Sequence, residues 1–472
     1  MNPTQQLIRQ TRRQFLASSA SGVGGLALAS LLAQDTHGSR SDPLAPKAPH
    51  VSGKAKACIF IYLAGAPSQI DLFTPKPKLK ELHGQQLPAK LTDGVRFAFI
   101  NKNAKVKSST RAFKQHGQSG MYFSELLPHI ATCADDICMI HSMKTEAFNH
   151  HPGQLMMNCG TQMFGQPSIG SWLNYGLGSV SENLPGYVVL TAGPPARGGA
   201  TNWSSGFLPS TYQGVLFRNQ GEPVLNLENP AGIDRQVQRH SLDLMKDLNH
   251  QRFKQIGDRE IDSRIAAYEL AYRMQAAAPE LIDLNSETQK TKEEYGINRK
   301  DGVQKSFATN CLLARRMVER GVRFINIYHG GWDQHGNLTR DLEKNAGIVD
   351  QPVSALIKDL KQRGMLDDTL VVWGTEFGRT PLAQGGDGRD HHPFAFTTWM
   401  AGGGSRPGYV HGESDEIGWH VKENPVHIHD FHATLLKLFG IDDKALSYRF
   451  KGLDYRLTGV GEDGTVIPQL LA

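Results

Sequence analysis

Short, uninterrupted runs of apolar and β-branched residues recur along the chain and predict buried strands. Helical patterns precede or follow most of these runs, and such alternation is typical of a parallel sheet covered by helices. The predicted strands are residues 57–63, 137–143, 187–191, 322–328, 369–373 and 396–400. The pattern therefore predicts an α/β fold with a mainly parallel central sheet and helices on both faces.

Helical periodicity marks three longer segments. The first covers residues 236–278, where Pro279 is expected to end the run, and we expect a helical insertion near residues 236–300. Two further helices, residues 304–320 and 352–363, each end at a glycine just before a predicted strand. These two helix-to-strand units are typical of a doubly wound fold.

The N-terminus has a different pattern. Two adjacent arginines, Arg12 and Arg13, precede a mildly apolar stretch, which predicts a twin-arginine export signal over residues 1–33. That stretch is too rich in Gly and Ser for a stable transmembrane span. Residues 34–56 are then a linker, and residues 57–472 form the α/β domain. We expect a periplasmic or extracellular protein whose partners include the twin-arginine export machinery.

Charge and cysteine content narrow the function further. Removing residues 1–33 takes away three arginines and no acidic residue, so the formal net charge falls from +5 to +2. No basic block alternates with aromatic residues in the rest of the chain, which argues against a nucleic-acid partner. The five cysteines contain no CxxC pair, which argues against a zinc ribbon and a dense disulfide framework.

Polar side chains follow the predicted strands at the positions where α/β proteins bind ligands, beyond the carboxyl ends of the strands. Asp333 and His335 come after strand 322–328 and, two residues apart in an extended chain, point the same way. One cation could bind both. Glu376 follows strand 369–373 and offers a further carboxylate for a metal.

Three more residues belong to this predicted edge. Arg379 suits an anionic substrate oxygen, since a guanidinium pairs well with oxyanions. His391 lies in a predicted loop before strand 396–400, and Asp71 follows the first strand. A divalent ion held by imidazoles and carboxylates is more typical of zinc, manganese or iron than of calcium.

Several motifs resemble those of an exported, functionally uncharacterised family of the alkaline phosphatase and sulfatase clan. They cover nearly the whole chain after the export signal. The motifs lie at residues 65–71, 149–152, 314–322, 331–335, 374–379 and 389–393. The resemblance implies an alkaline phosphatase/sulfatase-like fold and hydrolysis of phosphate or sulfate esters, with metal ions holding the ester oxygens. The implied substrate is a small-molecule or polysaccharide anionic ester.

The chain departs from sulfatases at the nucleophile. Pro152 and Gly160 reproduce the sulfatase spacing, which puts His150 at the nucleophile position and Gln154 at the position of an arginine. A histidine cannot become formylglycine. His150 could instead form a phosphohistidine, ligate a metal beside an activated water, or mark a site without catalysis.

Two functions follow from these residues. The first is an exported metal-dependent hydrolase, and the alternative is a non-catalytic exported binding or surface protein that retains the fold. Thr145 and Ser142 are nearby hydroxyls that could replace His150 as nucleophile. The hydrolase has the predicted catalytic residues His150, Asn149 and Arg379 and the predicted metal ligands Asp71, Asp333, His335, Glu376 and His391.

Overall fold

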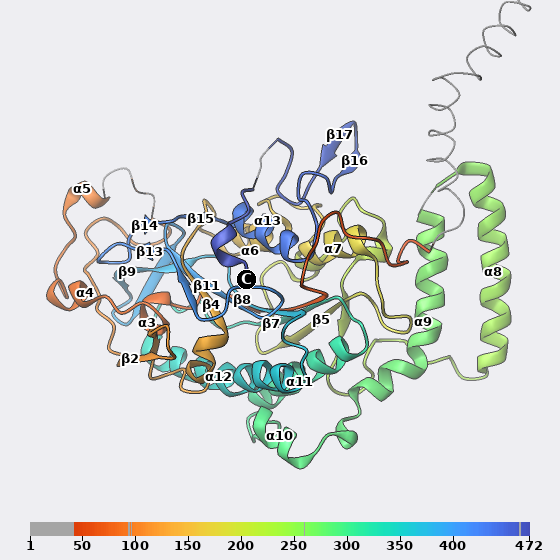
Figure 1. Ribbon diagram of the computed structural model, residues 1–472, viewed down its shortest axis with the longest axis horizontal. Coiled ribbons are helices and arrows are strands. Elements are labelled where there is room, and N and C mark those ends of the chain that lie inside the picture. Colours follow the sequence, from red (N-terminus) through yellow and green to blue (C-terminus); the bar gives the residue numbers. More distant parts are fainter. Residues whose placement is uncertain (1–41, 93–94, 96, 259, 462–463) are drawn as a thin grey trace, which may run out of the picture.

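A computed structural model describes residues 42–92, 95, 97–258, 260–461 and 464–472. The predicted export signal, residues 1–33, lies outside the described residues. The predicted linker is described from residue 42 onward. Figure 1 shows the described chain as a central sheet between helices, with one helical pair standing at the side of the molecule.

A sheet of nine strands forms the centre of the described chain (Figure 1). Its strands are β1 (Ala57–Leu63), β4 (Ile137–Lys144), β5 (Tyr187–Ala192), β6 (Val215–Phe217), β7 (Phe324–His329), β8 (Thr369–Gly374), β11 (Phe396–Ala401), β12 (Tyr409–His411) and β15 (Val426–His427). They lie in the order β12-β4-β11-β8-β1-β7-β5-β6, and β15 pairs with β4. Only the pairings of β11 are antiparallel among these described strands. The predicted mainly parallel α/β fold is confirmed.

The two faces of the sheet pack against two separate sets of helices. Along β1, Ile59 and Ile61 face one core, whereas Phe60 and Tyr62 face the other, as the alternation of side chains on a strand requires. Figure 1 places α11 and α12 on one side of the sheet and α6, α7 and α13 on the other. The five helices are α6 (His150–Cys159), α7 (Ile169–Leu177), α11 (Gly302–Glu319), α12 (Leu338–Gln362) and α13 (Ile428–Leu438).

The parallel strands end together, and this brings distant segments to one edge. In the register of the sheet, Leu63 of β1 lies opposite His329 of β7, and Tyr62 lies opposite Gly374 of β8. The three segments that follow these strands therefore leave the sheet side by side.

The segment that precedes the antiparallel strand β11 lies at the same edge of the sheet. Because β11 runs in reverse, Phe396 at its start lies opposite Met143 at the end of β4. The hairpin of β9 (Gly378–Gln384) and β10 (Gly388–His392) comes just before it. The prediction that His391 lies in a loop is wrong, because the segment pairs with β9 as a short strand.

Two helical predictions also need correction. The single run expected at 236–278 is two packed helices, α8 (Arg235–Ile256) and α9 (Glu260–Ile282), and the run does not stop at Pro279. Pro279 lies in the last turn of α9, so the main-chain hydrogen bond lost with its N–H falls only three residues before the helix ends at Ile282. The helix expected near 352–363 is the C-terminal part of α12, which begins at Leu338.

Shorter elements complete the described chain. They are α3 (Gln69–Leu72), α4 (Pro77–Glu81), α5 (Ala89–Thr92), α10 (Gln289–Tyr295), β2 (Phe113–His116), β3 (Met121–Ser124), β13 (Glu413–Ser414), β14 (Val421–Glu423), β16 (Tyr448–Phe450) and β17 (Leu453–Tyr455). Among the helices that the structure describes, none combines the length and apolarity needed to cross a bilayer.

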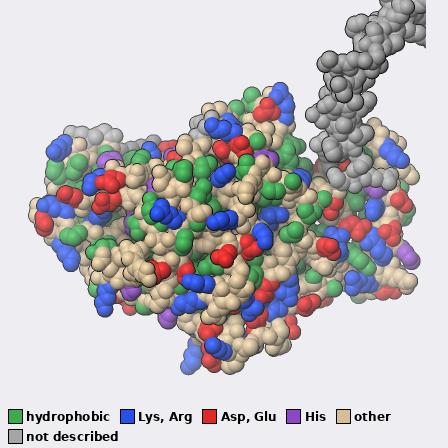
Figure 2. All heavy atoms as spheres, viewed as in Figure 1, with side chains coloured by type: hydrophobic (Ala, Val, Ile, Leu, Met, Phe, Trp, Pro, Cys, Tyr) green, Lys and Arg blue, Asp and Glu red, His purple; other side chains and the backbone are tan. Residues whose placement is uncertain are grey.

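The cysteines and the surface agree with a fold stabilised by its core. All five cysteines are buried free thiols, so the prediction against a disulfide framework is confirmed. Figure 2 shows acidic and basic side chains interspersed over one face of the molecule. Burial of the two apolar cores is therefore the main source of stability in the described chain.

We predict that Gly65→Ala destabilises the fold. Gly65 has a φ of +116°, and a Cβ atom there would lie 2.4 Å from the backbone nitrogen of Asp333. Backbone strain and the clash together should lower the free energy of unfolding by at least about 2 kcal/mol. Urea denaturation measures this change. Gly336→Ala is the matched control, because a Cβ atom there meets nothing within 4 Å; equal stability of the two variants would contradict the prediction.

Candidate metal centre

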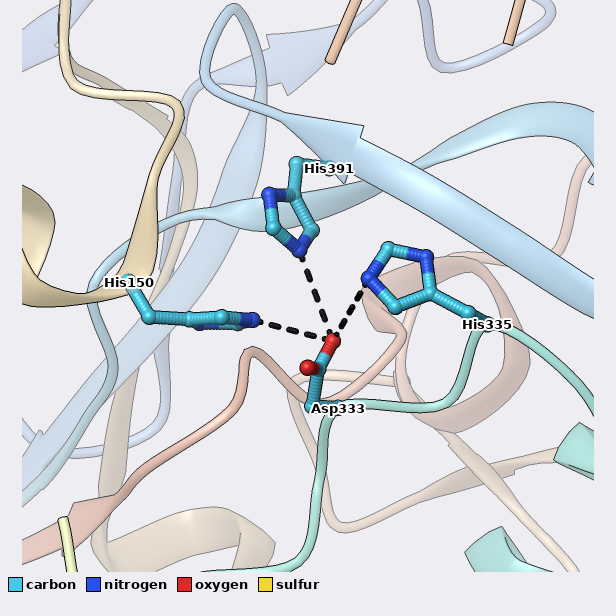
Figure 3. Close-up of side chains that lie close together, drawn as sticks. All are labelled: His150, Asp333, His335 and His391. Carbon is cyan, nitrogen blue, oxygen red and sulfur yellow. Dashed lines mark hydrogen bonds and ion pairs between the residues drawn. The ribbon is translucent and has the colours of Figure 1, made fainter. Parts of the chain in front are cut away.

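Four side chains from three parts of the chain converge at the carboxyl edge of the sheet. Their candidate ligand atoms all lie within 4.8 Å of one another. His150 begins α6, Asp333 and His335 follow β7, and His391 lies on β10. Figure 3 shows the three imidazole rings pointing at the carboxylate of Asp333. The structure thus brings together three of the five predicted metal ligands, and it adds His150.

One oxygen of Asp333 is the point of convergence. The Nε2 atoms of His150 and His335 each lie 2.9 Å from Oδ1 of Asp333, and Nε2 of His391 lies 3.4 Å from it. Burial opposes ionisation of Asp333, but the nitrogen atoms around it hold the pKa of this carboxyl far below its usual range. Asp333 is therefore an anion at neutral pH.

The other nitrogen of each imidazole, Nδ1, lies against an oxygen that can only accept a hydrogen bond. Each Nδ1 must therefore carry the proton, and each Nε2 of a neutral ring is left with a lone pair. The three Nδ1 contacts run from His150 to Oε1 of Glu376 (2.7 Å), from His335 to Oε1 of Gln384 (2.5 Å) and from His391 to the main-chain oxygen of Phe148 (2.7 Å).

This arrangement fits a divalent cation. When the three rings are neutral, their Nε2 lone pairs and the anionic oxygen of Asp333 converge as donor atoms for one cation, whereas a doubly protonated ring would donate to Asp333 instead. Nε2 of His150 is buried and has no hydrogen-bond partner among the described residues, although it lies 2.9 Å from Asp333. Imidazole and carboxylate donors suit zinc, manganese or iron, and tethering Nδ1 to an acceptor is how metal-binding histidines are usually oriented.

Glu376 lies behind His150 and outside the four-residue cluster. Its fully buried carboxylate accepts hydrogen bonds from the backbone nitrogen of Gly65 (2.8 Å), the hydroxyl of Tyr62 (3.2 Å) and Nε2 of Gln154 (3.2 Å), in addition to His150. Burial opposes its ionisation, but His150 and these donors lower its pKa. Glu376 therefore orients His150, and its predicted role as a direct metal ligand gains no support from this geometry.

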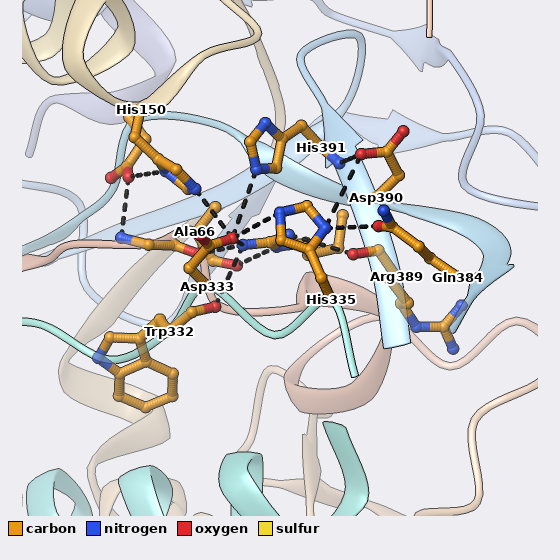
Figure 4. A network of polar contacts seen from close by, with 12 residues as sticks. Ala66, His150, Trp332, Asp333, His335, Gln384, Arg389, Asp390 and His391 are labelled. Atoms are coloured by element: carbon orange, nitrogen blue, oxygen red, sulfur yellow. Dashed lines mark hydrogen bonds and ion pairs between the residues drawn. The ribbon is translucent and has the colours of Figure 1, made fainter. Parts of the chain in front are cut away.

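Arg379 is turned into the protein. Its guanidinium is fully buried and donates to Oδ1 of Asp333 (2.8 Å). Figure 4 shows Asp333 within the surrounding polar network. Arg379 is not presented to a substrate, contrary to the predicted role, and instead fixes the position of Asp333. The guanidinium also donates to the main-chain oxygens of Gly65, Ala66, Trp332 and Arg389.

Asp71 has a partner of its own. It accepts two hydrogen bonds from Arg389, at 2.7 and 3.3 Å, and one from the hydroxyl of Ser68 at 2.5 Å. Burial opposes ionisation of Asp71, but Arg389 lowers its pKa. Asp71 is not one of the four clustered residues, and its buried ion pair holds β10 in place.

A cavity of about 580 Å³ opens onto the cluster. Asn149, a predicted catalytic residue, lies at its wall beside His150. The hydroxyls of Thr145 and Ser142 are buried outside this lining. Five lining residues were not predicted, namely Phe99, His151, Arg197, Gly198 and Gln384.

Arg197 is the unpredicted residue that the sequence could have indicated. It follows the predicted strand 187–191, so the rule that identified Asp333 and Glu376 applies to it as well. Phe99 and Gln384 follow no predicted sheet strand at its carboxyl end, and only the folded chain brings them to the cavity.

The family of the chain follows from its sequence. Residues 55–471 match the family described as "Protein of unknown function (DUF1501)". This chain belongs to that family. No curated protein matches the chain in sequence.

Several solved structures are similar to this chain at low identity and low TM-score. Ps i-CgsB is 12% identical, with 83% of this chain and 72% of that chain covered and a TM-score of 0.37. The PsFucS1 sulfatase from Pseudoalteromonas sp. is 11% identical, with 94% and 76% covered and a TM-score of 0.37. A mutant of TAB5 alkaline phosphatase with bound magnesium is 12% identical, with 77% and 96% covered and a TM-score of 0.33.

We predict that Asp71→Ala lowers stability but leaves metal binding intact. The variant leaves the buried guanidinium of Arg389 without its anionic partner, which should lower the free energy of unfolding by roughly 3–5 kcal/mol. The control is Asp454→Ala, which breaks the exposed ion pair with Arg449 and should cost under about 1 kcal/mol.

Denaturant unfolding measures both variants, and elemental analysis of the folded protein measures its metal. A stable Asp71→Ala protein that has lost its metal would show that Asp71 is a ligand after all.

Proposed function

We propose that this chain is an exported metal-dependent hydrolase of phosphate or sulfate esters. The observation that carries the proposal is the set of three imidazoles, each with Nδ1 tied to an acceptor and Nε2 directed at Asp333. The arginine pair in the predicted signal supports export and a periplasmic or extracellular location.

In this proposal the ion is held by His150, Asp333, His335 and His391. A divalent ion supplies Lewis acidity, which neutralises charge on an ester oxygen and makes water a stronger nucleophile. Arg379 keeps Asp333 in position from inside the protein.

The hydrogen bonds of His150 bear on the open question of the nucleophile. Its Nδ1 is engaged by Glu376, and its Nε2 is directed into the cluster. A histidine that uses both nitrogens in this way has none left for attack on phosphorus. We therefore assign His150 to the metal site and water to the role of nucleophile, in preference to a phosphohistidine.

The absence of a hydroxyl or thiol at the position of His150 favours the alternative, a binding protein that retains the metal site. A substrate panel distinguishes the two functions. We expect the metal-loaded protein to hydrolyse at least one of 4-nitrophenyl phosphate, bis(4-nitrophenyl) phosphate and 4-nitrophenyl sulfate. Metal binding without turnover of any of them would favour the binding protein.

We predict that the protein binds one zinc or manganese ion per chain and that Asp333→Ala and His391→Ala each abolish stoichiometric binding. Each variant removes one donor from a cluster of four. Isothermal titration and elemental analysis measure binding. His240→Ala, at an exposed position of α8, is the control and should bind as the wild type does. Unchanged binding in the two cluster variants would refute the site.

We further predict that Glu376→Gln weakens metal binding about 10- to 100-fold, the usual effect of losing a group that orients a ligand. The amide keeps the shape of Glu376 but removes the charge that fixes the proton on Nδ1 of His150. Competition with a chromogenic chelator measures the affinity, and denaturant unfolding confirms that the variant is folded. Complete loss of metal from a folded variant would point to direct ligation by Glu376.

A further inference from the structure

Two cavities meet at the candidate metal centre. The first, of about 580 Å³, is lined in part by Phe99, His335 and Gln384. The second, of about 490 Å³, is lined by Gly65, Gln154 and the segment 194–198. The two linings share His150, Arg197, Gly198 and Asp333. The cluster therefore lies at the junction of two spaces, each large enough for an organic group.

Arg197 is fixed at this junction by its main chain. Its carbonyl oxygen accepts a hydrogen bond of 2.8 Å from the fully buried Asn202, and a Cβ atom on the neighbouring Gly198 would lie 2.2 Å from Nε2 of His151. The residue itself is exposed, and its guanidinium has no ion pair or hydrogen bond among the described residues. Arg197 thus has an anchored main chain and a free guanidinium that can bind an anion.

Arg197 is also the one lysine or arginine among the described residues that line either cavity. Arg379 is fully buried, and its donors are used by Asp333 and by main-chain oxygens. Apart from a bound ion, Arg197 is therefore the one Lys or Arg side chain that the described linings offer to an anionic substrate.

The second cavity contains an unsatisfied polar atom. Oε1 of Gln154 is buried, 1% of the residue is exposed, and the atom has no hydrogen-bond partner among the described residues, while Nε2 is held by Glu376. A buried acceptor of this kind is satisfied by a donor such as a hydroxyl group or water. Gln154 therefore leaves a buried, unsatisfied acceptor behind the wall of the second cavity.

We infer that the substrate is a phosphodiester whose two organic groups occupy the two cavities and whose single negative charge pairs with Arg197. A phosphate or sulfate monoester has one organic group and would leave one cavity empty. The inference rests on the proposed function and narrows its substrate class. In hydrolysis, the oxygen of water bonds to phosphorus and one phosphorus–oxygen ester bond breaks. The departing oxygen takes up a proton from that water, and the products are an alcohol and a phosphate monoester.

The test compares substrates that all release the same leaving group, 4-nitrophenol. For the metal-loaded protein, kcat/KM should be at least about tenfold higher for bis(4-nitrophenyl) phosphate than for 4-nitrophenyl phosphate or 4-nitrophenyl sulfate. Methyl 4-nitrophenyl phosphate is a diester in which one organic group is small. Its kcat/KM should lie between that of bis(4-nitrophenyl) phosphate and those of the two monoesters. A preference for either monoester would overturn the diester inference and leave the hydrolase proposal standing. No turnover of any substrate would overturn both.

Variants of Arg197 supply a readout that does not need catalysis. Isothermal titration should show tighter binding of diphenyl phosphate, a slowly reacting diester, than of phenyl phosphate. Arg197→Gln should weaken binding of diphenyl phosphate at least about tenfold, Arg197→Lys should restore part of it, and the exposed Arg218→Gln should leave it unchanged. Equal binding by wild type and Arg197→Gln would overturn the assignment of Arg197.

Discussion

The site depends on the fixed position of one carboxylate, that of Asp333. Its Oδ1 atom is in contact with three imidazoles on one side and with the buried guanidinium of Arg379 on the other. Arg379 is in turn held by main-chain oxygens at the ends of the segments that follow β1 and β7. An anion placed in this way makes the convergence of three histidines electrostatically favourable, with a cation completing the balance.

The residues around this carboxylate act mainly by orienting one another. Glu376 and Gln384 fix two of the imidazoles through Nδ1, and the buried pair of Asp71 and Arg389 fixes the strand that carries the third. Glu376, Gln384 and Asp71 each lie on a different segment from the ring that they support. Loss of Glu376 or Gln384, which touch the rings directly, should therefore loosen the geometry of the site before it unfolds the chain.

Much of the fold and part of the candidate site could be predicted from the amino-acid sequence alone. The apolar runs located β1, β7 and β8, and parallel strands end at one edge, so Asp333 and His335 were expected close together. The direction in which a side chain points could not be predicted. Glu376 and Arg379 follow β8 as expected, but their partners are buried atoms of other segments, and only the packed chain defines those contacts.

The antiparallel direction of β11 allows the segment beside the candidate metal centre to change in length. Since β11 runs against its neighbours, the chain between β8 and β11 leaves and re-enters the sheet at the same rim. That excursion, residues 375–395, carries Arg379 and His391. Its hairpin tip around Gly385 and Gly386 can thus be lengthened or exchanged without shifting the register of the sheet, which makes it the natural point for engineering access to the candidate metal centre.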